Sequence, residues 1–160
     1  MIIILMGVSG CGKTTVGQIL ANKLNMPFMD ADDFHPPENV EKMNKGKPLT
    51  DADRYPWLKC LADNIIKWNR TGGAVLACSA LKEKYRKILS SGNPEVFYVY
   101  LKGEKNLIFD RMKKRKGHYM PLSLLDSQFK ALEEPENVIT VSIKKTPQEI
   151  AGQIIKLLPT

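Results

Sequence analysis

Short apolar runs alternate along the chain with longer segments in which apolar residues recur every three or four positions. The runs have the length of strands, and we expect strands at residues 2–6, 27–30, 74–78, 96–101 and 138–142. Strands that alternate with helices are typical of a doubly wound α/β fold with a mainly parallel sheet. The 160 residues contain no internal repeat or low-complexity linker, so we expect one domain spanning residues 1–160.

Capping residues mark where the longer segments begin. A long helix is expected to begin at Thr50, because Thr50 and Asp53 form a capping-box pattern, and to end before Gly72. The last helix is expected to begin after Thr146, which is followed by a proline and by a capping-box residue, Glu149. The apolar face of this last helix should comprise Ile150, Ile154, Leu157 and Leu158.

The sequence GVSGCGKT at residues 7–14 matches the phosphate-binding pattern G-x-x-x-x-G-K-[ST] and stands between the first strand and the first helix. Glycines let backbone N–H groups turn inward around phosphate oxygens at the positive end of a helix. Lys13 can then pair with the β and γ phosphates of ATP, and the Thr14 hydroxyl can ligate Mg²⁺. The alternative is a glycine-rich turn with a coincidental Lys-Thr. The residues expected to bind the nucleotide here are Gly7, Ser9, Gly10, Cys11, Gly12, Lys13, Thr14 and Thr15.

Composition and charge narrow the class of partner. The net charge of +7 suits either a surface that binds nucleic acid or an enzyme that binds a nucleotide and an acidic substrate. Because the sequence contains no nucleic-acid-binding motif, we expect no nucleic-acid partner. No apolar run approaches the roughly 20 residues that span a bilayer, and no signal-peptide pattern opens the chain. The spacing of three cysteines suggests neither a metal site nor disulfides, which favours the cytoplasm. Cys11 is either an oxidation-sensitive thiol or a plain small side chain.

Two carboxylates, Asp30 and Asp32, follow the second predicted strand. In an open parallel sheet they should emerge at the carboxyl edge, beside the phosphate loop. Asp32 is then the candidate base for a substrate hydroxyl, and Asp30 the candidate to hold Mg²⁺ through water; the alternative is an acidic turn or helix cap. The D-x-x-G and N-K-x-D signatures of a switch GTPase are missing from the sequence, which favours a small-molecule kinase over a GTPase. A nucleotide-binding regulator without catalysis is a second hypothesis, which is disfavoured by the intact residues Lys13, Thr14, Asp30 and Asp32.

A longer pattern is more specific than the phosphate loop. Segments with the sequences DADDFHP (30–36), GKPLTD (46–51), DRYPWL (53–58), ACSALK (77–82), RKGH (115–118), QF (128–129) and LEEP (132–135) resemble the P-loop gluconokinase family, which is related to shikimate and adenylate-type kinases. The resemblance covers nearly the whole chain. It implies ATP-dependent phosphorylation of D-gluconate to 6-phospho-D-gluconate. It also implies a sheet in the order 2-3-1-4-5, a mobile lid at about residues 113–122, and a homodimer.

An acidic polyol such as gluconate calls for a guanidinium group together with histidine, carboxylate and hydroxyl partners. Three of the candidates for these roles also have a structural alternative. Arg54 could form an ion pair with Asp51 or Asp53 in place of a substrate contact. His35 could be only a turn residue, and Arg86 could be structural on a helix surface. Trp57, near the start of the long helix, is expected to pack in the core rather than to stack on a ligand. The candidate substrate-binding residues are Asp32, His35, Arg54, Ser79 and Arg86.

The region after the fourth predicted strand is basic. Residues 107–115 have helical period and lead into the segment KGHYMP at 116–121. A lid that closes over ATP would exclude water and bring cations to the transferred phosphoryl group. By resemblance to adenylate-kinase-type lids, Arg111 would stack on adenine and Arg115 would reach the phosphates as a catalytic cation, with Lys116 and His118 as weaker candidates. The alternative is that these are solvated helix cations.

Overall fold

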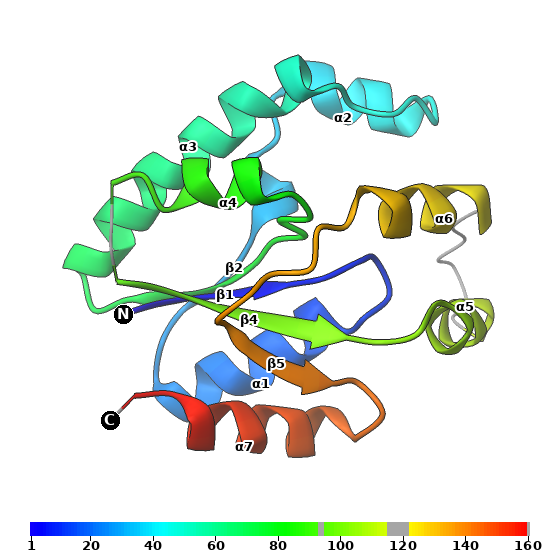
Figure 1. The fold of residues 1–160 in the computed structure, drawn as a ribbon. Coiled ribbons are helices and arrows are strands. Elements are labelled where there is room, and N and C mark those ends of the chain that lie inside the picture. Colours follow the sequence, from blue (N-terminus) through cyan, green and yellow to red (C-terminus); the bar gives the residue numbers. More distant parts are fainter. Residues whose placement is uncertain (93–94, 115–121, 160) are drawn as a thin grey trace.

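A parallel sheet of five strands forms the centre of the computed structural model, which describes residues 1–92, 95–114 and 122–159. Its order is β2-β3-β1-β4-β5 (Figure 1), which confirms the predicted class and the predicted strand order. Each predicted strand is found to within one residue at either end. The strands are β1 (Ile2–Met6), β2 (Phe28–Asp30), β3 (Ala74–Ala77), β4 (Val96–Lys102) and β5 (Ile139–Ser142).

Helices cover both faces of this sheet. Helices α1 and α7 lie on one face and α3 and α4 on the other, while α2, α5 and α6 lie beyond the carboxyl ends of the strands (Figure 1). Sites in open α/β sheets form at that edge. The helices are α1 (Lys13–Leu24), the 3-10 helix η1 (Ala31–Phe34), α2 (Pro37–Asn44), α3 (Asp51–Arg70), α4 (Glu83–Leu89), α5 (Lys105–Lys113), α6 (Leu122–Ala131) and α7 (Pro147–Leu157).

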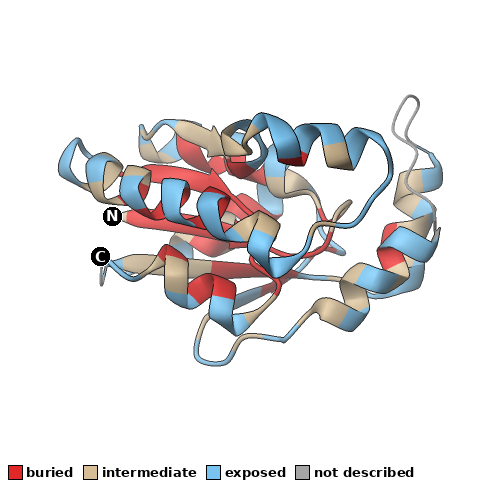
Figure 2. Ribbon diagram, turned by 90° about the horizontal axis from the view of Figure 1, so that it is seen from above, coloured by how far each residue is buried: buried red, intermediate tan, exposed pale blue. Residues whose placement is uncertain are grey.

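The sheet divides the core into two clusters. Strand β1 is fully buried, and the central strands of the sheet are red in Figure 2. Its side chains alternate between the two faces of the sheet, because successive residues of a strand point in opposite directions. Ile3 and Leu5 pack with α1 and α7 in one cluster, whereas Ile2, Ile4 and Met6 pack with α3 and α4 in the other. The strand thus carries apolar residues at every position, as expected for a parallel strand covered on both sides.

Local signals for helix ends are confirmed. Asp53 N–H donates to Thr50 Oγ1 (3.1 Å) and Thr50 N–H donates to Asp53 Oδ2 (2.8 Å), so the predicted capping box closes the start of α3. A second capping box joins Thr146 and Glu149 at the start of α7. The prediction that Leu157 belongs to the apolar face of the last helix was wrong. Leu157 is 51% exposed, because α7 ends there and Leu158 turns into the core instead.

Trp57 packs in the core, as predicted. Its side chain is 5% exposed, and its indole N–H donates to the carbonyl of Ala31 (2.7 Å). The ring also stacks on the imidazole of His35, with centroids 4.0 Å apart. Helix α3 therefore supports η1 and the residue that follows it.

Gly17 allows α1 to approach the sheet closely, since a Cβ at this position would overlap the ring of Phe28 and press on Leu5. We predict that Gly17→Ala lowers the free energy of unfolding by about 1–3 kcal/mol, although alanine favours helices. The matched control is Gly152→Ala in α7, where no atom lies within 4 Å of the added Cβ. That change should raise the free energy of unfolding by up to about 1 kcal/mol. Urea denaturation of both variants measures the two values, and a shift in the same direction would contradict the packing argument.

Candidate active site

The phosphate loop joins β1 to α1 at the carboxyl edge of the sheet. Gly7, Gly10 and Gly12 all have positive φ angles (148°, 82° and 96°), a region that glycine adopts without steric cost. The Lys13 ammonium donates to the carbonyl oxygens of Gly7 (2.9 Å) and Val8 (3.1 Å). The lysine therefore lies over the first residues of the loop, where it is ready to meet the β and γ phosphates.

Neighbouring segments support this loop. Gly7 N–H donates to the carbonyl of Ser79 just after β3 (3.2 Å). Ser79, one of the predicted substrate-binding residues, therefore contacts the loop through its backbone. A side chain on Gly10 would overlap Met112 of α5. Cys11 is buried, which favours the plain small side chain over an accessible thiol.

Helix α6 contacts the same loop through Gln128, a residue for which no functional role was predicted. Gln128 Oε1 accepts from Ser9 N–H (2.7 Å), and Gln128 Nε2 donates to Ser9 Oγ (3.0 Å). The two residues are 119 positions apart, so no local spacing in the sequence connects them. The only signal was the Gln128-Phe129 pair within the family resemblance.

Asp30 and Asp32 lie at the end of β2, as predicted. In the sheet register Asp30 is level with Ala77 of β3, and Ala77 is level with Leu5 of β1, so all three reach the same edge. Asp30 Oδ1 accepts from Asp32 N–H (3.0 Å) and caps η1. Burial raises the pKa of the Asp30 carboxyl, and the Asp32 carboxylate adds to this, while the Lys13 ammonium opposes it. The Asp32 side chain is exposed.

The electrostatic surroundings of Cys78 show that these groups converge. The charges of Lys13, Asp32 and Asp30 all act on this thiol, which follows β3. The pKa of Cys78 is raised to about 12, mainly because the thiol is buried. At neutral pH the thiol is protonated and is no nucleophile. The loop lysine and the two carboxylates thus lie within electrostatic range of one thiol at the sheet edge.

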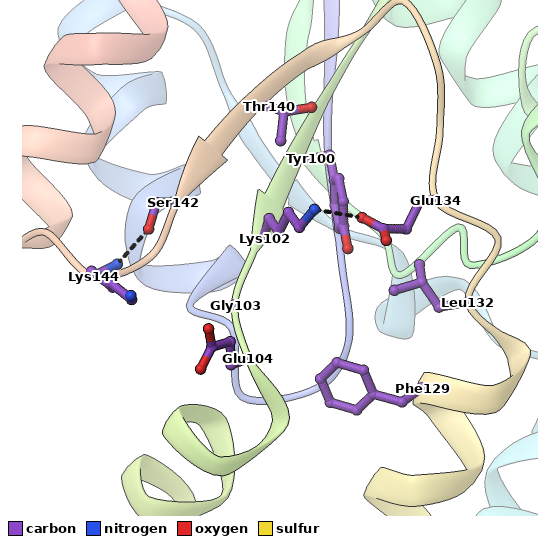
Figure 3. A pocket seen from close by; sticks show the side chains of 10 residues that line it. All are labelled: Tyr100, Lys102, Gly103, Glu104, Phe129, Leu132, Glu134, Thr140, Ser142 and Lys144. Atoms are coloured by element: carbon purple, nitrogen blue, oxygen red, sulfur yellow. Dashed lines mark hydrogen bonds and ion pairs between the residues drawn. The ribbon is translucent and has the colours of Figure 1, made fainter.

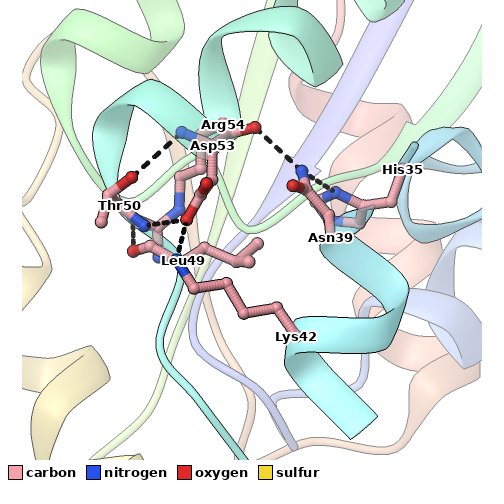
Figure 4. Close-up of polar contacts among 7 residues, drawn as sticks. All are labelled: His35, Asn39, Lys42, Leu49, Thr50, Asp53 and Arg54. Atoms are coloured by element: carbon pink, nitrogen blue, oxygen red, sulfur yellow. Dashed lines mark hydrogen bonds and ion pairs between the residues drawn. The ribbon is translucent and has the colours of Figure 1, made fainter. Parts of the chain in front are cut away.

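A hydrogen-bonded chain connects His35 to the start of α3 (Figure 4). Asn39 is 4% exposed, and its Nδ2 lies 3.2 Å from His35 Nδ1 and 2.9 Å from the carbonyl of Asp53. A carbonyl can only accept, so the Asn39 atom between them is the donor, and His35 Nδ1 must accept. The imidazole is therefore neutral with its proton on Nε2. Burial lowers the pKa of His35, and the Arg54 guanidinium lowers it further.

Arg54 lies beside His35 and contacts Tyr85 of α4. Its Nη1 donates to the carbonyl of Leu49 (2.8 Å) and to Tyr85 Oη (3.2 Å). The alternative ion pairs to Asp51 or Asp53 are not found among the described residues, where Asp51 pairs with Lys84 and Asp53 with Lys42. Both hydrogen bonds that Arg54 makes to described residues use Nη1, so Nη2 has no hydrogen-bond partner among those residues.

Arg86 is buried rather than exposed on a helix surface, with 9% of the residue accessible. Its Nη1 donates to the carbonyl of Ala80 (2.7 Å) and its Nη2 to the carbonyl of Glu133 (3.0 Å). Ala80 has a φ of +44°, which is uncommon for a residue with a side chain. Arg86 therefore ties the loop after β3 to the loop after α6, and its contact with substrate stays a prediction.

Of the predicted lid residues, Arg111 is described and Arg115, Lys116 and His118 lie outside the described residues. Arg111 Nη2 donates to the carbonyl of Ile143 (2.6 Å), just after β5. This contact brings α5 and the loop after β5 together. The stacking of Arg111 on adenine and the phosphate contact of Arg115 stay predictions.

Known proteins resemble the chain over almost its full length. A family model described as Shikimate kinase matches residues 9–159. A probable gluconokinase of Rattus norvegicus is 45% identical, over 98% of this chain and 97% of the relative. The gluconokinase of Gluconobacter oxydans (strain 621H) is 46% identical, over 96% of this chain and 89% of the relative. A crystal structure of a gluconokinase from Sinorhizobium meliloti 1021 superposes with a TM-score of 0.89 at 39% identity, over 96% and 89% of the two chains.

The chain belongs to the gluconokinase family. By contrast, a shikimate kinase structure from Aquifex aeolicus reaches a TM-score of 0.64 at 21% identity, which shows a shared fold. The family predicted from the sequence is therefore confirmed, as is a kinase that uses a nucleotide.

This gluconokinase-family chain also has a pocket of about 500 Å³ that contains none of the predicted site residues (Figure 3). Lys102 and Glu134 form an ion pair (3.1 Å) at its wall. Burial, followed by the Glu134 carboxylate, raises the pKa of Tyr100 to about 12. The lining residues are Tyr100, Lys102, Gly103, Glu104, Phe129, Leu132, Glu134, Thr140, Ser142 and Lys144.

We predict that native His35 titrates below pH 6.5, the ordinary value for histidine. Because the unfolded chain takes up the proton first as pH falls, the stability contributed by neutral His35 is complete above about pH 6.5 and is lost below it. NMR titration of the imidazole, assigned with a His118→Gln variant, measures the native pKa. Arg54→Met should move that pKa upward, whereas Lys84→Met, which removes the partner of Asp51, should leave it in place. A native pKa at or above 6.5 would refute the prediction that the folded protein favours the neutral form of His35.

Proposed function

We propose that this protein transfers the γ-phosphoryl group of ATP to D-gluconate and releases 6-phospho-D-gluconate. The observation that carries the proposal is the 45–46% identity to gluconokinases, which spans both the phosphate loop and the acceptor-side segment. Lys13, Asp30 and Asp32 all lie within electrostatic range of Cys78, just after β3, which supports phosphoryl transfer at this edge of the sheet. Such transfer depends mainly on positioning and on electrostatic stabilisation.

Asp32 is the proposed acceptor of the proton that leaves the attacking hydroxyl of gluconate. It is held in place by η1, which starts at the Asp30 cap, and it is exposed where an acceptor could approach. The O–P bond to gluconate forms as the bond from the γ phosphorus to the β–γ bridging oxygen breaks, and ADP leaves with that oxygen. Lys13, and Arg115 by resemblance, are the proposed cations for the charge on the transferred group.

Thr14 and Asp30 are the proposed residues near a Mg²⁺ ion. Among the described residues, no group of three or more His, Cys, Asp or Glu could hold a metal. Mg²⁺ usually binds through one or two protein oxygens together with substrate phosphates and water, so a hydroxyl and a single carboxylate fit it. When bound at these residues, Mg²⁺ would neutralise part of the negative charge of the nucleotide phosphates.

Arg54 and His35 are the proposed groups that recognise the acceptor. The Nη2 edge of Arg54 could pair with the gluconate carboxylate, and His35 Nε2–H could donate to a hydroxyl oxygen. Ser79 lies beside the phosphate loop and offers a further hydroxyl. Arg86 is proposed as a substrate contact from the sequence, although two of its nitrogens are engaged by carbonyl groups.

A coupled assay with Mg·ATP tests the substrate. Turnover with D-gluconate should exceed the acceptor-free ATPase rate, and shikimate should give no increase above that rate. Phosphorylation of shikimate or another sugar acid in place of gluconate would overturn the substrate and keep the enzyme class.

Asp32→Asn tests the proposed base. We expect this change to lower kcat by roughly 100-fold or more while the affinity for ATP stays within about twofold, because the amide cannot take the proton. Asp33→Asn is the matched control, since Asp33 is an exposed neighbour in the same short helix and should keep near wild-type kcat. Steady-state kinetics with isothermal titration of an ATP analogue separates the two effects. Near wild-type turnover of Asp32→Asn would show that another group accepts the proton.

A homodimer, a cytoplasmic location and the lack of a nucleic-acid partner stay predictions. In the described part of the chain, no helix is long and apolar enough to cross a membrane. Sedimentation velocity would measure the oligomeric state.

A further inference from the structure

Helix α6 is fixed against the rest of the molecule on several sides. Leu125 is buried in the cluster that packs on α1 and α7, and Asp126 forms an ion pair with Lys105 of α5. Beyond its end, Glu133 N–H donates to the carbonyl of Leu81 (2.8 Å). These contacts hold the Gln128 side chain at the phosphate loop, so its two hydrogen bonds to Ser9 need little further ordering.

The atoms of this contact can be assigned without ambiguity. Ser9 N–H can only donate, so the Gln128 atom at 2.7 Å from it is the carbonyl oxygen. The amide nitrogen of Gln128 then faces Ser9 Oγ at 3.0 Å and donates to it. A serine hydroxyl has one proton and accepts through its lone pairs. Because Ser9 Oγ accepts from Gln128, its own proton is directed to a different partner.

Ser9 lies at the end of the loop where the γ phosphate is expected. The Lys13 ammonium rests on the carbonyls of Gly7 and Val8, the two residues before Ser9. This lysine is the cation for the β and γ phosphates in the G-x-x-x-x-G-K-[ST] pattern. The carbonyl of Ser79 accepts from Gly7 N–H at the start of the loop, and the charges of Lys13, Asp30 and Asp32 all act on the adjacent Cys78 thiol.

We propose that Gln128 is a positioning residue that directs the Ser9 hydroxyl proton to a γ-phosphoryl oxygen of ATP. The proposal rests on the kinase activity proposed above and adds a donor and its support to that site. A neutral donor aimed at the transferred group stabilises the charge that its oxygens carry in the transition state. Gln128 also removes the rotational freedom of the hydroxyl before ATP binds, so that no reorientation is needed during the reaction.

A double-mutant cycle tests the proposal. Gln128→Met keeps the side-chain length and removes both hydrogen bonds, and Ser9→Ala removes the hydroxyl alone. Each should lower kcat by about 10- to 100-fold, with KM for gluconate within about twofold of wild type. The double variant should be no worse than the more impaired single variant, because both changes remove the same oriented donor. Gln153→Met, on the outer side of α7, is the matched control and should keep wild-type kcat.

Three results would overturn the proposal: multiplied losses in the double variant, unchanged kcat in either single variant, or a Gln128→Met loss confined to the melting temperature. If Gln128→Met does not fold, Gln128→Glu replaces it in the cycle. A carboxylate accepts from both Ser9 groups and turns the hydroxyl proton toward itself, so the same non-additivity is expected. A wild-type enzyme inactive on gluconate would contradict the proposed substrate alone. The cycle is then measured on acceptor-free ATP hydrolysis, where the same non-additivity supports the role of Gln128 and additivity refutes it.

Discussion

Strand β1 determines where the phosphate loop lies. It pairs with β3 on one side and β4 on the other, and it is fully buried, so its carboxyl end cannot move without disturbing both core clusters. The phosphate loop begins directly at that end. Backbone N–H groups can bind a phosphate only if the backbone itself is held still, because no side chain adjusts the fit. A buried central strand is the firmest anchor that this fold offers.

The acceptor side depends on a different interaction, the buried amide of Asn39. A buried polar group is costly unless its hydrogen bonds are made, and Asn39 makes them to His35 and to the backbone of Asp53. These bonds fix the register of α2 against α3 and the tautomer of the imidazole. The exposed ion pairs nearby, such as Lys84 with Asp51, contribute little by comparison. The orientation of His35 thus follows from one satisfied amide.

Much of the fold was predictable because its signals are local. Strand runs, the phosphate loop and both capping boxes depend on residues within a few positions of one another, and the structure confirms them. Helical period alone overextended the apolar face of α7 to Leu157, since a period does not show where packing ends. The contacts of Gln128 with Ser9, and of Arg86 with Glu133, join residues that are far apart in sequence. No spacing rule predicts such pairs. The roles assigned to individual acceptor-side residues rest on their convergence at one edge and stay predictions.

The division of the core by the sheet has an evolutionary consequence. The segments proposed to handle ATP, α1 and α5, pack in one cluster with α7, whereas η1, α3 and α4, which carry most acceptor candidates, pack in the other. Substitutions that reshape one side therefore leave the packing of the opposite side largely intact. A lineage with this architecture can exchange one hydroxylated metabolite for another while it retains its phosphate donor.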